Sequence, residues 1–237
     1  MELVIFIGAW FLAGVVNHVV GLGAAMVAMP MVVHFIPLSL AVPSSALIVL
    51  ALNVQLAWSY RQSIQWVPLV YILIGSGLGT VAGIFLVKSV DEAQLKTLMG
   101  VFLICYAGYA LFLEKEKSRR VLPLWGIPTG ALSTFLGMAF SFNGPPLAVF
   151  ATMAGWTADE VKGFLGASFI ISGTTIVTGQ LLAGLQTAQS LTFFASACPA
   201  ALLGGLFGIR LARRFALRST RRLLLCVLLF AGFSQIL

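Results

Sequence analysis

Ser141-Phe142-Asn143-Gly144-Pro145-Pro146 interrupts a long apolar run in the second half of the chain. Paired prolines end one helix, because proline lacks an N–H and clashes with the preceding turn, and they suit the first turn of a new helix. Within a bilayer such a break is tolerated only where the freed backbone is buried in protein or lines a cavity. The start of the new helix also favours an anion. The stretch therefore predicts either a binding site or a packing kink without a ligand.

The composition around this break is that of a membrane protein. Of the 237 residues, 60% are hydrophobic and 9% are charged, whereas about a quarter of the residues of a soluble domain are charged. We expect an all-α polytopic membrane protein. Its apolar segments cover 3–20, 22–36, 41–60, 66–87, 95–113, 121–140, 144–155, 161–183, 190–211 and 222–237. The second and seventh are too short to cross a bilayer comfortably, and each is either a tilted short helix or the returning arm of a hairpin.

The basic residues indicate which loops face the cytoplasm. Ten of the fourteen lysines and arginines lie in two stretches, 115–120 and 210–222. Lysine and arginine concentrate in cytoplasmic loops of membrane proteins, so both stretches are expected to be cytoplasmic. Counting segments from them places both chain termini outside. The net charge of +7 therefore marks loops and does not indicate a nucleic-acid partner.

An internal repeat divides the chain. Gly14–Gly21 matches Gly130–Gly137 at an offset of 116, and Gly79-xxx-Gly83 matches Gly204-xxx-Gly208 at an offset of 125. Each half holds about five helical segments, an odd number, so we expect the halves to be inverted repeats with interrupted or re-entrant helices at corresponding positions. This organisation is typical of secondary transporters. The predicted parts are a first membrane repeat over 1–113, a cytoplasmic linker over 114–120 and a second membrane repeat over 121–237.

Glycine and cysteine are assigned to packing. Several glycines recur at four-residue spacing, which lets helix backbones approach closely. Cys105, Cys198 and Cys226 are isolated in apolar segments without metal-ligand spacing, so we expect buried core thiols and predict no metal or cofactor site. The glycines assigned to helix packing are Gly75, Gly79, Gly83, Gly126, Gly130, Gly204 and Gly208.

The first half has a break of its own, Gly21-Leu22-Gly23-Ala24-Ala25. If both breaks lie near mid-depth, two helix N-termini face one cavity from opposite sides, each with about half a positive charge and several unpaired N–H donors. An anion is then favoured without a buried arginine, which is costly in a bilayer. The candidate substrate-binding residues are Asn17, His18, Gly21, Gly23, Ser44, Ser45, Ser133, Ser141, Asn143, Gly144 and Pro145.

Histidine is the candidate for coupling. No carboxylate lies in the middle of an apolar segment, and His18 is the intramembrane titratable group beside a break. Its imidazole either gains a proton together with the anion or stays neutral and bonds a neighbouring helix. The expected partners are a small anionic substrate, the lipid bilayer and a coupling proton or cation.

The chain resembles the sulfite exporter TauE/SafE family of membrane permeases, also described as 4-toluene sulfonate uptake permeases. The resemblance rests on Gly14 to Pro30 with its Gly-x-Gly element, Pro43-Ser44-Ser45, Tyr60-Arg61-Gln62, and Gly130 to Pro146 ending in Gly-Pro-Pro. It implies transport of sulfite, a sulfonate or a related sulfur-containing anion across a bacterial inner membrane, often outward.

Two other classes remain open from the residues alone. Facing helix N-termini would serve a passive anion channel as well as a carrier. Gly166-Ala167-Ser168 resembles the Gly-x-Ser of an intramembrane serine protease, but both histidines lie far upstream, and Ser168 is better explained as a helix-packing serine. We therefore expect no catalytic residues.

Overall fold

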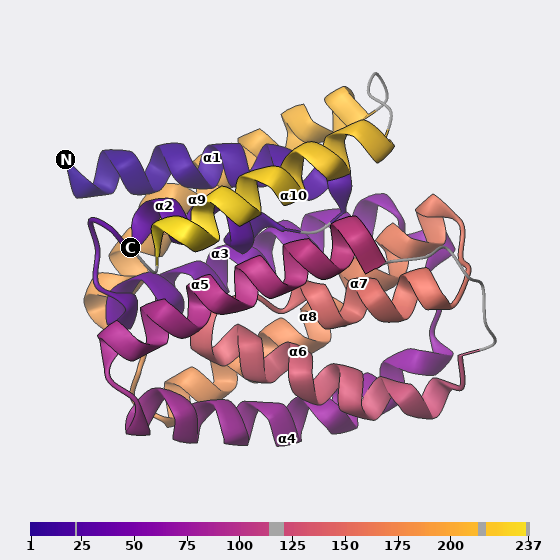
Figure 1. The fold of residues 1–237 in the computed structure, drawn as a ribbon, viewed down its shortest axis with the longest axis horizontal. Coiled ribbons are helices and arrows are strands. Elements are labelled where there is room, and N and C mark those ends of the chain that lie inside the picture. Colours follow the sequence, from indigo (N-terminus) through magenta and orange to yellow (C-terminus); the bar gives the residue numbers. More distant parts are fainter. Residues whose placement is uncertain (22, 114–120, 213–216, 236–237) are drawn as a thin grey trace.

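The computed structural model describes residues 1–21, 23–113, 121–212 and 217–235, in which helices and turns alternate and no strand occurs. The α-helices are α1 (Glu2–Val20), α2 (Ala24–Val32), α3 (Leu38–Ser59), α4 (Val67–Ser89), α5 (Glu92–Gly108), α6 (Gly126–Phe140), α7 (Gly144–Met153), α8 (Ala158–Leu182), α9 (Ala188–Ala212) and α10 (Leu217–Ser234). Among them α1, α3, α4, α5, α8 and α9 are long and apolar enough to cross a membrane. The bundle in Figure 1 is the all-α polytopic architecture that the composition predicts.

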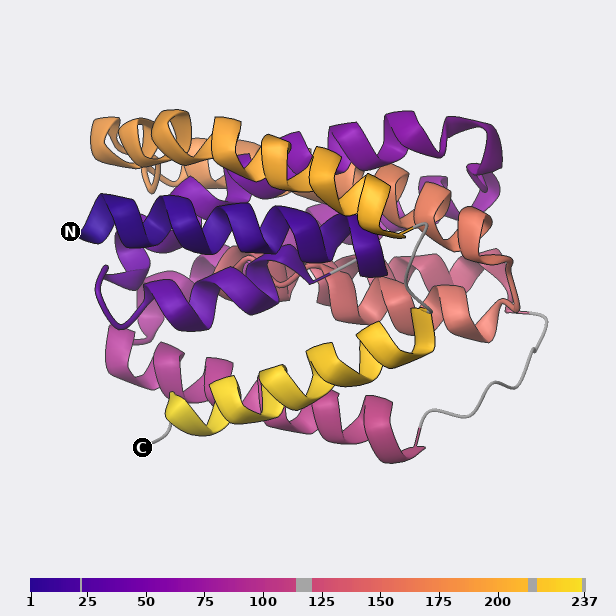
Figure 2. The same cartoon turned by 90° about the horizontal axis from the view of Figure 1, so that it is seen from above.

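The first break turns the chain back on itself. α2 has 9 residues, too few to cross a bilayer, and it runs back beside α1 (Figure 2). Phe6 near the start of α1 packs edge-on against Phe193 near the start of α9, with ring centroids 5.2 Å apart. Gln186, just before α9, donates a hydrogen bond to the carbonyl oxygen of Pro43 near the start of α3. These contacts place the starts of α1 and α3 at the same end of the bundle. α2 ends there too, because α3 follows it directly, so α1 and α2 form a hairpin.

α6 and α7 form a second hairpin. Gly126, the first residue of α6, lies against the start of α4, since a Cβ there would come within 3.0 Å of the Pro68 carbonyl oxygen. Beyond the 10-residue α7, Glu160 accepts a hydrogen bond of 2.8 Å from Gln65, just before α4. α6 therefore begins, and α7 finishes, at the end of the bundle that holds the α3–α4 connection. The two hairpins enter from opposite ends, in agreement with the hairpin interpretation of the short segments, whose depth in the bilayer stays a prediction.

Glycines form the closest helix contacts. A Cβ on Gly79 of α4 would overlap the carbonyl oxygen of Ala131 in α6, and one on Gly204 of α9 would overlap that of Phe11 in α1. The other predicted packing glycines meet a neighbouring helix in the same way: Gly75, Gly83, Gly126, Gly130 and Gly208. Their assignment to helix packing is confirmed.

Helix pairing is reciprocal between the halves. The first helix of each half packs against the fourth helix of the other half, as α1 does on α9 and α6 on α4. The two third helices, α3 and α8, pack together, and so do the two fifth helices, α5 and α10. The start of α1 and the end of α10 lie at one end of the bundle (Figure 1). A residue-by-residue inverted repeat, the repeat boundaries and the assignment of that end to the outside stay predictions. The linker 114–120 and residues 213–216 of the second basic stretch lie outside the described residues.

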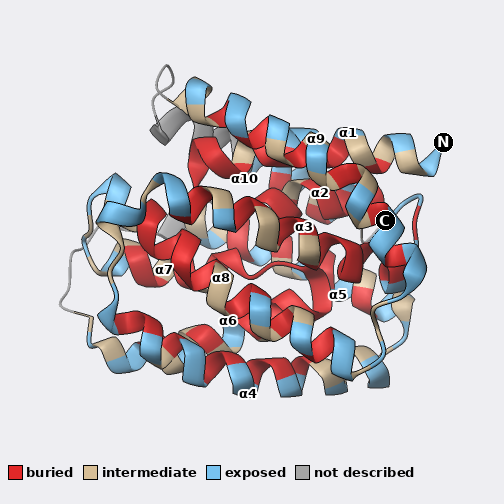
Figure 3. Cartoon of the chain, turned by 180° about the vertical axis from the view of Figure 1, so that it is seen from behind, coloured by how far each residue is buried: buried red, intermediate tan, exposed pale blue. Residues whose placement is uncertain are grey.

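The outer faces of the bundle are exposed and apolar, as lipid contact requires (Figure 3). Phe85 and Phe207, on α4 and α9, are examples. The expectation of three buried thiols is wrong, because Cys105 and Cys226 are exposed and Cys198 is half-buried. Lipid chains are as apolar as a protein core, so a sequence pattern does not distinguish the two surroundings.

Candidate functional site

The first break joins α1 to α2 through two glycines with positive φ. Gly21 closes α1 with φ 91° and Gly23 precedes α2 with φ 101°, a conformation that glycine adopts without steric cost. No side chain caps α2. The four backbone N–H groups from Gly23 to Met26 therefore have no acceptor within the helix and are available to an anion.

The second break is built differently. Ser141 ends α6 with φ 62°, the one positive φ of a non-glycine residue within the described ranges, and its Oγ donates to the Val42 carbonyl oxygen at 3.1 Å. α7 then begins at Gly144 with its prolines in the first turn, as predicted. Pro145 and Pro146 carry no N–H, so α7 offers a ligand fewer donors than α2 does. The expectation of several free donors at each helix end is wrong for this one.

The two helix starts meet in the interior. The first turn of α2 and the start of α7 line one small cavity of about 10 Å³, room for roughly one water molecule. It lies beside Val49 and Phe169, about half-way along α3 and α8, and thus near mid-depth of the bundle. The lining residues are Asn17, Gly23, Ala24, Ala25, Met26, Val49, Asn53, Ser141, Phe142, Asn143, Gly144 and Phe169.

Three asparagines, Asn17, Asn53 and Asn143, supply the side-chain amides of this cavity. Asn17 Nδ2 donates to Asn53 Oδ1 at 3.4 Å, which ties α1 to α3. Asn143 Nδ2 donates to Ser172 Oγ at 3.2 Å, which ties α7 to α8. The backbone carbonyl oxygen of Asn143 accepts a 2.6 Å hydrogen bond from the Ser133 hydroxyl. The described lining contains no charged side chain. Its positive potential comes from the helix ends, which suits a small anion.

Of the predicted residues, Asn17, Gly23, Ser141, Asn143 and Gly144 line the cavity. The others surround it or lie apart.

Ser133 and Pro145 are buried directly behind the α7 start. Ser44 bonds the Leu40 carbonyl oxygen at 2.7 Å, and Ser45 bonds the Met29 sulfur at 3.2 Å, so neither hydroxyl lines the cavity. His18 is fully buried on another face of α1, with Nδ1 3.2 Å from the Gly14 carbonyl oxygen.

Sequence reasoning missed several residues near the breaks. Asn53 lines the cavity from α3, and its polar side chain in an apolar segment was an available signal. Lys162 lies against Gly21, since a Cβ there would come 3.2 Å from Lys162 Cγ. It stands close to the predicted start of a span, where a lysine is ordinarily an interfacial anchor, and so gave no signal.

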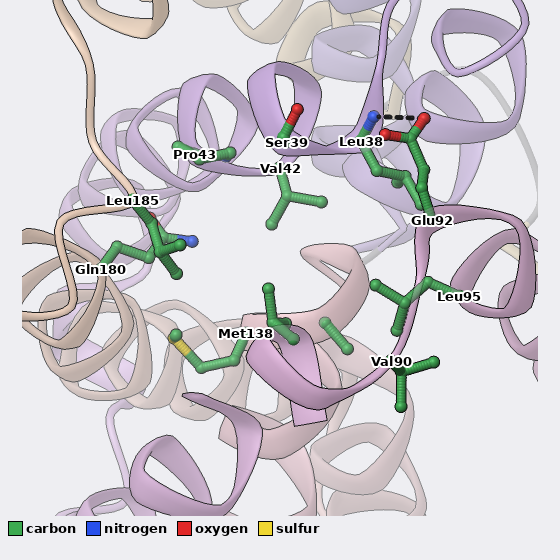
Figure 4. A pocket seen from close by; sticks show the side chains of 12 residues that line it. Leu38, Ser39, Val42, Pro43, Val90, Glu92, Leu95, Met138, Gln180 and Leu185 are labelled. Atoms are coloured by element: carbon green, nitrogen blue, oxygen red, sulfur yellow. Dashed lines mark hydrogen bonds between the residues drawn. The ribbon is translucent and has the colours of Figure 1, made fainter. Parts of the chain in front are cut away.

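A larger cavity of about 190 Å³, whose lining side chains are shown in Figure 4, lies between the start of α3 and the α4–α5 connection. We call this cavity the vestibule. Its lining is mainly apolar, and the Glu92 carboxylate in it is paired with Lys96 at 3.0 Å and with the Leu38 N–H at 3.1 Å. Val42 lines the vestibule and also accepts the hydrogen bond from Ser141 of the central cavity. One layer of residues therefore separates the two cavities. The vestibule is lined by Leu38, Ser39, Val42, Pro43, Val87, Val90, Glu92, Leu95, Met138, Ala139, Gln180 and Leu185.

Comparison with known proteins assigns the chain to a family. The profile of the sulfite exporter TauE/SafE family matches residues 6–234, nearly the whole sequence. The chain belongs to this family. It is 24% identical over 178 residues to the probable inner membrane transporter protein TsaS of Comamonas testosteroni, an alignment that covers 74% of each chain. No solved structure matches.

Membership of the TauE/SafE family makes this chain a membrane transport protein and not an enzyme. The resemblance seen in the glycine and proline motifs is confirmed. Ser168, the residue that suggested a protease, is fully buried in α8, and its Oγ has no hydrogen-bond partner within the described residues.

Proposed function

We propose that this protein is a secondary transporter of the bacterial inner membrane that carries a small sulfur-containing anion, such as sulfite or an organosulfonate. The anion binds between the N-terminal ends of α2 and α7. The observation that carries this proposal is that these two helix starts, 120 residues apart in the chain, line one cavity half-way through the bundle. The family description, sulfite exporter, supports the substrate class and outward transport.

The donor arrangement fits an oxyanion head. Sulfite and sulfonate groups carry their charge over three oxygens, and the first turn of α2 presents four N–H groups near one point. On the opposite side the α7 start adds the Asn143 and Gly144 backbone N–H groups. The cavity has room for about one water molecule, so the two helix starts must move apart to admit a sulfite or sulfonate group. A central site that is closed in this way favours a carrier that changes conformation over a passive channel, which needs a continuous path.

Saturable, competitive flux is the expected result for the purified protein in liposomes. Radiolabelled sulfite uptake is measured at increasing concentration, and sulfate, thiosulfate, taurine, sulfoacetate and lactate are added as competitors. Because binding is carried by N–H donors around an oxyanion, sulfite and the sulfonates are expected to compete at least about tenfold better than lactate. Flux that rises without saturation, or conductance bursts in a planar bilayer, would reject a carrier.

His18 supports a proposal for coupling to protons. Its ring is fully buried, and within the described residues Nε2 has no hydrogen-bond partner. The Gln55 Oε1 acceptor also lacks a partner, and both side chains face Gly205, where a Cβ would lie 2.7 Å from His18 Cε1. The charged group nearby is Lys162, whose Nζ is 3.5 Å from the His18 carbonyl oxygen. A titratable nitrogen without a hydrogen-bond partner is available to gain a proton during the cycle.

His18→Asn is expected to reduce sulfite accumulation driven by a pH gradient by at least about tenfold, the effect of losing the proton-binding group. Sulfite exchange at equal pH on both sides, which needs binding but no net proton movement, is expected to stay within about threefold of wild type. The matched control is His34→Asn, at a helix end, which should change neither the accumulation nor the exchange of sulfite. Full accumulation in the His18 variant would show that the proton moves elsewhere.

A further inference from the structure

Lys162 is a buried lysine in the first turns of α8. Lys162 is 5% exposed. Its Nζ lies 3.2 Å from the Tyr60 hydroxyl and 3.5 Å from the His18 carbonyl oxygen. The Tyr60 ring adds a cation–π contact, with Nζ 5.1 Å from its centroid. An ammonium has three N–H donors, so the neutral partners leave one for a ligand.

No carboxylate in the described ranges neutralises this ammonium. The one salt bridge found there joins Lys96 to Glu92 at the far end of the bundle. Glu160, two residues before Lys162, is held by Thr157 and Gln65 instead. A buried cation without an anionic partner costs several kcal/mol, and a protein that carries an anion can recover this cost when the substrate arrives.

An offset of 120 residues, the separation between the starts of α2 and α7, pairs Lys162 with Val42. Lys162 lies against Gly21 at the first break, and Val42 bonds Ser141 at the second. Gly21 and Ser141 are 120 residues apart in the sequence, and so are Val42 and Lys162. Val42 separates the central cavity from the vestibule, so Lys162 occupies the corresponding place between the first break and the opposite end of the bundle. That end holds the α3–α4 connection, and its predicted side is the cytoplasm.

We propose that Lys162 forms a second anion subsite, through which a singly charged oxyanion passes between the cytoplasm and the central cavity. The inference rests on the proposed function and adds a charged residue to the proposed transport pathway. Tyr60 orients the ammonium and offers its hydroxyl to the same anion. No lysine or arginine is among the residues that line the apolar vestibule at the other end. Nearby, Lys96 is paired with Glu92 and Lys88 is exposed. The pathway is therefore asymmetric, and the anion is held more strongly on the Lys162 side.

A structural role makes a different prediction. The His18 carbonyl oxygen belongs to the last turn of α1, where a cation also stabilises the helix dipole. A residue that only stabilises α1 would affect transport from both faces alike, or would change the amount of folded protein. The sidedness of the effect therefore separates the two roles.

The test measures sulfite KM from each face, in inside-out and right-side-out vesicles of cells that express the full chain, without an ion gradient. We expect Lys162→Gln to raise KM at the cytoplasmic face about tenfold, since a charge-assisted bond is lost, and to leave KM at the other face within about twofold. Lys162→Arg, which keeps the charge, should lie between wild type and the glutamine variant at the cytoplasmic face. Without a gradient, detailed balance requires kcat/KM to be the same for inward and outward transport, so a variant changes both ratios equally. KM itself can change at one face alone, and it is therefore the constant to measure.

Two further variants complete the test. Arg61→Gln removes an exposed cation at the same end of the bundle, which donates to the Trp58 carbonyl oxygen, and should leave both KM values unchanged. Tyr60→Phe keeps the charge and removes the hydroxyl, so it should raise KM at the cytoplasmic face alone and decides the matter if the glutamine variant fails to insert. Equal changes at both faces, or none, would overturn the subsite. Absence of saturable sulfite flux in the wild type would instead overturn the proposed function, and the subsite with it.

Discussion

Replacing Asn143 with leucine is expected to lower sulfite flux about 100-fold or more while the protein still inserts and stays folded. A hydrogen bond to a charged group contributes about 1.5–3 kcal/mol, and leucine both removes the amide and fills a cavity of about 10 Å³ with hydrocarbon. The anion would then have to enter an apolar surface, which is strongly unfavourable. The measurement is the initial rate of radiolabelled sulfite uptake into liposomes, normalised to the amount of inserted protein.

Ser172→Ala is the matched control for this variant. Asn143 Nδ2 donates to Ser172 Oγ at 3.2 Å, so the serine change breaks the same bond between α7 and α8 without adding an apolar group to the cavity. We expect it to reduce flux by less than about fivefold, which corresponds to the net value of one neutral hydrogen bond. If both variants lose flux equally, Asn143 acts by fixing α7 and does not contact the anion.

Local backbone chemistry explains which parts of the site were predictable. Proline and glycine restrict or free the backbone at their own positions, and the breaks at Gly21–Gly23 and Gly144–Pro145 lie where the sequence indicates. Helix packing through small residues is equally local in its signal, and Gly79 and Gly204 form contacts of the expected kind. The meeting of the two breaks in one cavity was expected from the predicted repeat of the two halves.

Residues whose role depends on where a helix starts were less predictable. Pro43 was expected near the beginning of a segment, which made Ser44 and Ser45 candidates for its N-terminus. α3 begins five residues earlier, at Leu38, and the hydroxyl of Ser44 bonds its own helix. Pro43 is the sixth residue of α3 and lies inside the helix, at the cost of one backbone hydrogen bond, so a proline does not by itself mark where the helix starts.

Tertiary placement explains the remaining omissions. Asn53 and Lys162 become neighbours of the breaks only because α3 and α8 cross the bundle beside both hairpins. No local pattern indicates which face of a long apolar helix is turned to a cavity and which to lipid. The vestibule depends on four separate segments and is likewise a property of the assembled bundle.

Replacing Ala25 with aspartate is expected to abolish sulfite binding by placing a fixed negative charge where the substrate charge lies. Ala25 is buried in the first turn of α2 and lines the central cavity. A carboxylate at this position is stabilised by the free N–H groups and by the helix dipole. It also repels an incoming anion at close range, where two like charges cost about 4 kcal/mol at an effective dielectric constant of 20. We therefore expect sulfite affinity to fall by at least about 100-fold.

Ala25→Asn separates charge from size, because asparagine has the same shape and no charge. It is expected to bind sulfite within about tenfold of wild type. Thermal unfolding in detergent provides the second measurement: sulfite stabilises wild type and the asparagine variant by mass action, whereas the aspartate variant should already be at least as stable as unliganded wild type and gain nothing from sulfite. Equal loss of binding in both variants would mean that bulk at Ala25 blocks the cavity, and the α2 N-terminus would no longer be identified as the place where the anion's charge is held.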